Sequence, residues 1–195
     1  MSYSFQTRQA DIHSPYLAEA AKLHVNCLPS TLTSRRGIKT TEGLYRLLLR
    51  LGHTGHFAMD GNNLVGGLFV MRHARQRANF SITMYRPWSW SIALRKLGVH
   101  NVFAQLLDQV ILQRAARRRD PHDYIIALYV SDSSRRLGVA RNLLQIAIAD
   151  ATARGVGLVV DTALINDSAK NLYESLGFVQ SKQTRLSVQL TLGLG

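Results

Sequence analysis

The clearest feature of the hydrophobic pattern is an apolar run from Tyr124 to Val130 that is followed by a helix-like repeat. A strand that is apolar at every position is typical of the centre of a sheet, where both faces are buried. From about Val139 to Arg154 the apolar residues recur at helical spacing, and Gly155 ends this repeat. The pattern therefore predicts a central strand that leads through a short turn into a helix.

Strands and helices alternate through the rest of the C-terminal half. The segment 156–162 repeats the apolar pattern of a buried strand, and a short helix is predicted from near Ser168 to Gly177. The segment 185–192 alternates between apolar and polar residues, as a half-buried strand does. This alternation predicts an α/β arrangement (α+β, with a mixed sheet).

The N-terminal half predicts a strand at 4–10, two helices and then a hairpin. Ser14 is a candidate helix cap with Pro15 at the first helical position, and a second helix is predicted over 40–52. Two apolar runs flank residues 60–63, Asp-Gly-Asn-Asn, which is a strong hairpin signal. With the later elements, the sheet is expected to have about seven strands and flanking helices.

Residues 73–120 follow a different pattern and carry most of the excess positive charge. Two helices are predicted in a helical insert near 86–119, and the stretch from Arg72 to Arg119 holds ten Lys or Arg residues and one acid. A field of this kind attracts nucleic acid, anionic membranes or phosphorylated ligands, although it is equally compatible with a solubilising surface. Trp88 and Trp90 allow stacking on a ligand or packing of the insert onto the core.

Composition narrows the class of protein. The chain has 195 residues, 46% of them hydrophobic, a net charge of +12 and a single cysteine, Cys27. One cysteine excludes an internal disulfide framework and favours a reducing compartment. No apolar run reaches the roughly 20 residues of a membrane helix, and the first residues lack the pattern of a signal peptide. We expect a cytoplasmic protein without a membrane span, and the His, Cys and Asp spacing predicts no metal site.

The turn between the central strand and the next helix has the chemistry of an anion site. A turn that enters a helix exposes main-chain N–H groups without intrahelical partners, and the helix dipole adds positive potential. Gly138 and Ala140 keep the side chains short, and Arg135 and Arg136 add charge. The spacing matches neither a P-loop nor a dinucleotide fingerprint. By itself the turn is compatible with a phosphate cradle or with a solvated loop.

Two segments together resemble the GNAT superfamily of acetyl-CoA-dependent N-acetyltransferases. The family's Arg/Gln-x-x-Gly-x-Gly/Ala turn is matched by Arg135, Gly138 and Ala140. Its second signature, an asparagine, an alanine, a Leu-Tyr pair and Gly-Phe, is matched in 166–178, beginning about 26 residues after Ala140. The resemblance covers about 125–179. It implies a single N-acetyltransferase domain over residues 1–195, with the basic insert at about 73–120 as a departure from the family pattern.

The resemblance also implies where acetyl-CoA, the co-substrate, is held. Main-chain groups at the end of the central strand would contact its pantetheine arm, and main-chain N–H groups of the following turn would hold its pyrophosphate. The residues so implied are Leu128, Tyr129, Val130, Arg135, Arg136, Leu137, Gly138, Val139 and Ala140, with Asn166 as a further contact. For Asn166 the alternative is a helix cap without contact to acetyl-CoA.

Two side chains are the candidates for proton transfer. Tyr173 stands where the family's general acid stands, and a phenol is suited to protonate a departing thiolate. Asp161 lies five residues before Asn166, at the spacing of a catalytic glutamate in the ribosomal-protein-alanine branch, so it is a candidate base that acts through a water. The alternatives are a tyrosine packed on the sheet and an aspartate that caps a turn.

The predicted function is acetyl transfer to the primary amine of a small molecule, for which the basic insert favours an acidic or phosphorylated acceptor. The alternatives are acetylation of a protein N-terminus or lysine, or a basic nucleic-acid-binding protein of the same fold without catalysis. Nucleic acid is the less favoured partner, and a homodimer is left open.

Overall fold

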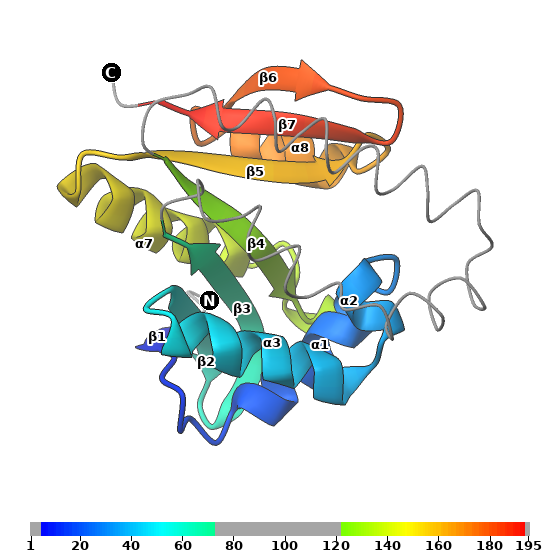
Figure 1. The fold of residues 1–195 in the computed structure, drawn as a ribbon, viewed down its shortest axis with the longest axis vertical. Coiled ribbons are helices and arrows are strands. Elements are labelled where there is room, and N and C mark those ends of the chain that lie inside the picture. The colour runs from blue at the N-terminus through cyan, green and yellow to red at the C-terminus, as the bar shows by residue number, and fades with distance from the viewer. Residues whose placement is uncertain (1–4, 73–121, 194–195) are drawn as a thin grey trace. The chain divides into compact units, whose positions relative to one another are not determined.

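The computed structural model of the chain describes residues 5–72 and 122–193, so the predicted insert with Trp88 and Trp90 lies outside the described residues. The chain forms two compact units, Met1–Arg72 with Ile125–Asp150 and His73–Tyr124 with Ala151–Gly195. In the described part, seven strands form a sheet in the order β1-β2-β3-β4-β5-β7-β6 (Figure 1). This confirms the predicted mixed sheet with flanking helices.

The first unit contains three antiparallel strands, β1 (Gln6–Gln9), β2 (Thr54–Asp60) and β3 (Asn63–Met71). The predicted hairpin joins β2 to β3, and Gly61 has a φ of 58° at its first central position, as a type II′ turn requires. Helices α1 (Leu17–Cys27), α2 (Leu32–Arg35) and α3 (Ile38–Arg50) lie between β1 and β2 in the sequence. α1 and α3 lie side by side (Figure 1).

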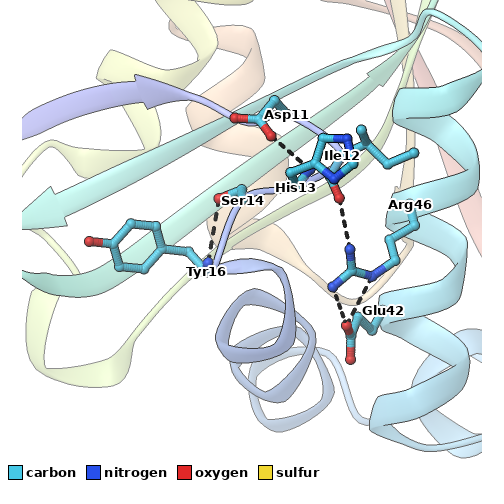
Figure 2. Close-up of polar contacts among 7 residues, drawn as sticks. All are labelled: Asp11, Ile12, His13, Ser14, Tyr16, Glu42 and Arg46. Carbon is cyan, nitrogen blue, oxygen red and sulfur yellow. Dashed lines mark hydrogen bonds and ion pairs between the residues drawn. The ribbon is translucent and has the colours of Figure 1, made fainter.

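The connection from β1 to α1 corrects one sequence prediction. The helix begins at Leu17 rather than at Pro15, because Ser14 closes a turn in which its hydroxyl accepts from the Tyr16 N–H at 3.4 Å. Figure 2 shows how Arg46 on α3 fixes this connection, donating to the Ile12 carbonyl at 2.7 Å and pairing with Glu42 at 2.7 Å. The connection between β1 and α1 is thereby tied to α3.

An aromatic core fills the first unit. Tyr45 on α3 is stacked on Phe69 of β3, with ring centroids 3.6 Å apart and the planes 4° from parallel. His24 on α1 is buried and bonds through Nδ1 to the Tyr45 hydroxyl and through Nε2 to Thr31 Oγ1 at 3.3 Å. Because burial removes the ring from water, the neutral form is favoured, and the pKa of His24 is lowered to about 4.

Strand β4 (His122–Val130) and helix α7 (Val139–Ala153) correspond to the predicted central strand and the helix after it. Both elements have residues in each of the two units. Gly155, with a φ of 67°, ends the helix as predicted.

The second unit contains β5 (Gly157–Ala163), α8 (Asp167–Glu174), β6 (Val179–Gln183) and β7 (Ser187–Leu192). β7 pairs antiparallel with both β5 and β6. The hydrophobic pattern does not single out β6, because its residues are almost all exposed and show no apolar alternation. Asp123 at the start of β4 is fully buried and forms an ion pair with Arg154, so this carboxylate is structural.

Candidate functional site

The turn after β4 is stabilised by main-chain hydrogen bonds within the first unit. The Ser131 N–H donates to the Val65 carbonyl at 2.8 Å, which extends the strand contact beyond Val130. A single 3-10 turn, Asp132–Ser134, follows, and the Ser134 N–H donates back to Ser131 at 2.9 Å. The chain then enters α7 at Val139.

Two residues in this turn adopt left-handed backbone conformations. Arg136 has a φ of 62°, and it is the one non-glycine residue with positive φ in the part of the chain that the structure describes. Gly138 has a φ of 84°, and a Cβ placed on it would meet nothing within 4 Å. Alternation between left-handed and ordinary residues turns successive N–H groups toward one side, which is the geometry of an anion-binding nest. The open space at Gly138 permits close approach of a ligand to the main chain.

The first turn of α7 adds further donors. The first bond of the ladder joins the Asn142 N–H to the Gly138 carbonyl at 3.0 Å. The N–H groups of the three preceding residues are therefore at a helix N-terminus, where the dipole favours an anion. The turn and the helix start together offer main-chain donors of the kind that hold a pyrophosphate.

The arginines of this turn are not equivalent. Arg135 forms an ion pair with Asp132 at 2.8 Å, so its charge is largely balanced within the turn. Arg136 is exposed, and the described part of the chain contains no hydrogen bond or ion pair to its guanidinium. Of the two, Arg136 is the side chain whose charge is available to a phosphate.

The end of β4 leads directly into this turn within the first unit. Leu128 is partly exposed, whereas Tyr129 and Val130 are buried. The Cys27 thiol donates to the Val130 carbonyl at 3.3 Å, so that predicted contact group already has a donor, and burial raises the pKa of Cys27. The Tyr129 side chain packs into the aromatic core, with its ring 5.4 Å from that of His24. Only main-chain groups of Tyr129 are therefore candidates for ligand contact.

In the second unit, Tyr173 lies on the buried face of α8. Its side chain is 5% exposed, and its ring centroid is 5.4 Å from that of Phe178. Burial raises the pKa of Tyr173, so the phenol keeps its proton at neutral pH. Among the described residues none hydrogen-bonds to this hydroxyl. The packing alternative and the acid role are compatible, because the ring packs while the hydroxyl holds a proton.

Asn166 is the N-cap of α8. Its side-chain oxygen accepts from the Ala169 N–H at 3.1 Å. This is the capping role that the sequence left open, and it uses the oxygen of the amide but none of its N–H groups. The contact of Asn166 with acetyl-CoA stays a prediction.

Asp161 is held by two side chains from neighbouring strands of the second unit. The Tyr124 hydroxyl donates to Oδ2 at 2.8 Å, and Gln189 Nε2 donates to Oδ1 at 3.0 Å. Asp161 is partly exposed, while both donors are buried. Sequence analysis missed Tyr124 and Gln189, because the partners of a side chain across a sheet depend on strand register, and register is not visible in one strand's pattern.

The predicted residues therefore fall into two groups. The first unit holds the end of β4, the turn and the start of α7, and the second unit holds Asp161, Asn166 and Tyr173. Within the described ranges, no cluster of three His, Cys, Asp or Glu residues is arranged to hold a metal ion. A membrane-crossing helix is likewise not found among the described helices.

The sequence matches the model of the acetyltransferase (GNAT) family over residues 46–178. Among the curated proteins, none matches this sequence.

Several solved structures share the fold. The ribosomal-protein-S18-alanine N-acetyltransferase from Escherichia coli has a TM-score of 0.60 and 12% identity, covering 97% of this chain and 96% of that one. The protein yncA from Salmonella typhimurium, solved with its cofactor acetyl-CoA, has a TM-score of 0.62 and 15% identity, covering 98% of this chain and 94% of that one. NAA60 from Arabidopsis thaliana, in complex with a bisubstrate analogue, has a TM-score of 0.59 and 14% identity, covering 95% and 97%. At these identities the likeness concerns the fold.

Proposed function

The chain belongs to the acetyltransferase (GNAT) family, and on that premise we propose that it acetylates the primary amine of a small molecule by direct attack on acetyl-CoA. The family makes it an acyltransferase with acetyl-CoA as co-substrate. The identity of the acceptor and the roles of individual residues are the content of the proposal.

The observation that carries the proposal is the set of main-chain donors between Arg136 and the first turn of α7. The positive φ values of Arg136 and Gly138 and the open space at Gly138 fit a pyrophosphate. The residues proposed to hold acetyl-CoA are Leu128, Tyr129, Val130, Arg135, Arg136, Leu137, Gly138, Val139, Ala140 and Asn166.

Acetyl transfer requires an unprotonated amine and a proton for the leaving thiolate. In the proposal Asp161, through a water, takes a proton from the acceptor ammonium. The amine nitrogen then bonds to the acetyl carbon and the carbon–sulfur bond breaks. Tyr173 donates its phenolic proton to the thiolate, and the acetylated nitrogen gives up its second proton, which restores the phenol. Burial raises the pKa of Tyr173, so the phenol carries its proton when the thiolate forms.

Acetylation of a protein N-terminus is the second candidate. It is favoured by the position of Asp161 five residues before Asn166, and by the fold shared with an enzyme named for a ribosomal protein alanine. The basic stretch from Arg72 to Arg119 supports an acidic or phosphorylated acceptor for either candidate.

An assay of free thiol release from acetyl-CoA across an amine panel tests the proposal. The panel contains amino-sugars, polyamines, aminoglycosides, amino acids and peptides with free N-termini. We expect turnover with a small amine, and acetyl-CoA at 100 times its Kd should stabilise the fold by about 2.7 kcal/mol. Turnover with peptides alone would support the second candidate. Neither stabilisation nor turnover would contradict both.

A further inference from the structure

The carboxylate of Asp161 is clamped from two strands of the second unit. Asp161 on β5 and Gln189 on β7 are directly opposite in the antiparallel register, which places both side chains on one face of the sheet. Gln189 Nε2 reaches Oδ1 at 3.0 Å, and the Tyr124 hydroxyl on β4 reaches Oδ2 at 2.8 Å. Each carboxylate oxygen thus has its own donor.

The burial of these donors sets them apart from surface contacts. Gln189 is fully buried and Tyr124 is 8% exposed, whereas Asp161 is open enough to meet solvent. A buried amide or phenol lowers the stability of the fold unless it is hydrogen-bonded. Both residues donate to the same partly exposed carboxylate. Because the two donors are buried, their side chains are more restricted than those of a contact between surface residues.

The neighbouring carboxylate shows a different arrangement. Asp123, next to Tyr124 in the sequence, is fully buried and bound to the guanidinium of Arg154. An arginine partner brings a compensating charge to a carboxylate, whereas a phenol and an amide add hydrogen bonds that orient it and carry no charge of their own.

We propose that Tyr124 and Gln189 are positioning residues, which fix the carboxylate of Asp161 in the orientation that receives the proton of the acceptor ammonium. This inference rests on the proposed function, in which Asp161 is the base. Two donors from different strands restrict rotation of the carboxylate about its last side-chain bond. The carboxylate oxygens are then held in a fixed orientation toward the acceptor nitrogen or the intervening water. Efficient proton transfer requires such a fixed orientation.

The test uses Tyr124→Phe and Gln189→Met, which keep the size of each side chain and remove its hydrogen bond. Acetyl transfer to the best amine of the panel is measured as kcat and as KM for the amine. A hydrogen bond to a charged group contributes about 1.5–3 kcal/mol, so we expect each variant to lower kcat about 10-fold or more. KM for the amine should change less than about 3-fold, because the step affected is proton transfer.

Double substitutions separate positioning from a structural role. In an Asp161→Ala background, adding Tyr124→Phe or Gln189→Met should lower kcat by no more than about 2-fold, because both residues act through the missing carboxylate. Ser181→Ala is the matched control, since its hydroxyl donates to the main-chain carbonyl of Gln189 at 3.2 Å. This control should keep the kcat of the wild type.

The outcomes distinguish this inference from the proposed function. Active wild-type protein with unchanged kcat in both single variants would overturn the inference alone. Losses that multiply in the Asp161→Ala background would overturn it as well, because the residues would then act independently of the carboxylate. Wild-type protein without turnover on any amine would overturn the proposed function and this inference together. Melting temperatures of all variants show whether a loss of folded protein accounts for a lower rate.

Discussion

The turn that follows β4 and the carboxylate cluster on β5 and β7 are built in opposite ways. The turn offers main-chain N–H groups, and its key residues are defined by backbone angles, such as the φ of 84° at Gly138. The cluster consists of side chains, with Asp161 held between Tyr124 and Gln189. Substitutions in the turn should therefore act through conformation and alter binding, whereas substitutions in the second unit should act through lost chemical groups and alter turnover.

The largest effect is expected in the second unit, at the phenol of Tyr173. Tyr173→Phe should lower kcat by about 10²- to 10⁴-fold, the usual contribution of a general acid, and change the Kd for acetyl-CoA less than about 2-fold. Steady-state kinetics and calorimetric titration with acetyl-CoA measure the two quantities. Tyr16→Phe removes a partly exposed phenol of the first unit and is the control. An unchanged kcat in Tyr173→Phe would remove the phenol from the mechanism.

The next effect concerns the core of the unit that carries the turn. Burial lowers the pKa of His24 from 6.5 to about 4, so between these values the unfolded chain binds more protons than the folded one. Stability from this group is complete above about pH 6.5 and is lost as the pH falls toward 4, by about 3 kcal/mol. Urea unfolding at pH 7 and at pH 4.5 measures the change.

Substitution of this histidine checks the assignment. His24→Gln should reduce the slope of unfolding free energy against pH in that interval, whereas His13→Gln, at an exposed position, should leave it in place. Equal slopes in all three proteins would contradict a buried, neutral His24.

A smaller effect is expected from backbone strain at Gly138. Gly138→Ala forces an alanine into a left-handed conformation, at a cost of about 1–2 kcal/mol. If the turn relaxes to avoid this strain, its N–H groups diverge and the Kd for acetyl-CoA should rise about 10-fold. Gly155→Ala is a matched control, because Gly155 also has positive φ and open space but lies after α7. It should lose similar stability and keep its affinity; equal losses of affinity in both variants would argue against the turn.

The smallest effect is expected at Arg136. Arg136→Gly relieves a left-handed conformation that is unfavourable for a residue with a Cβ, and should raise the free energy of unfolding by about 0.5–1 kcal/mol. Because main-chain donors hold the pyrophosphate in our proposal, the Kd for acetyl-CoA should change less than about 3-fold. A rise of the Kd for acetyl-CoA above 10-fold would show that the guanidinium, and not the main chain, dominates binding. The turn would then also act through a side chain, as the second unit does.

The sequence pattern predicts the structure correctly where local chemistry decides it. The hairpin at Gly61, the strand over β4 and the end of α7 at Gly155 follow from glycine conformations and apolar runs, and the structure has them where predicted. The start of α1 was misplaced, because the competition between a cap at Ser14 and a turn is decided by contacts of the following residues. β6 was missed, because an exposed edge strand has no hydrophobic alternation.

The sequence by itself determined the class of fold, the position of the turn between β4 and α7, and the residues proposed for binding and proton transfer. These features depend on neighbours a few positions apart, since helix starts, turns and strand periodicity are local. Only the tertiary structure decided that Asn166 caps α8, that Asp123 is neutralised by Arg154, and that Asp161 is held by Tyr124 and Gln189. The two carboxylates are the same residue type on adjacent strands of one sheet, and what separates their roles is which donors strand register and helix packing place beside them.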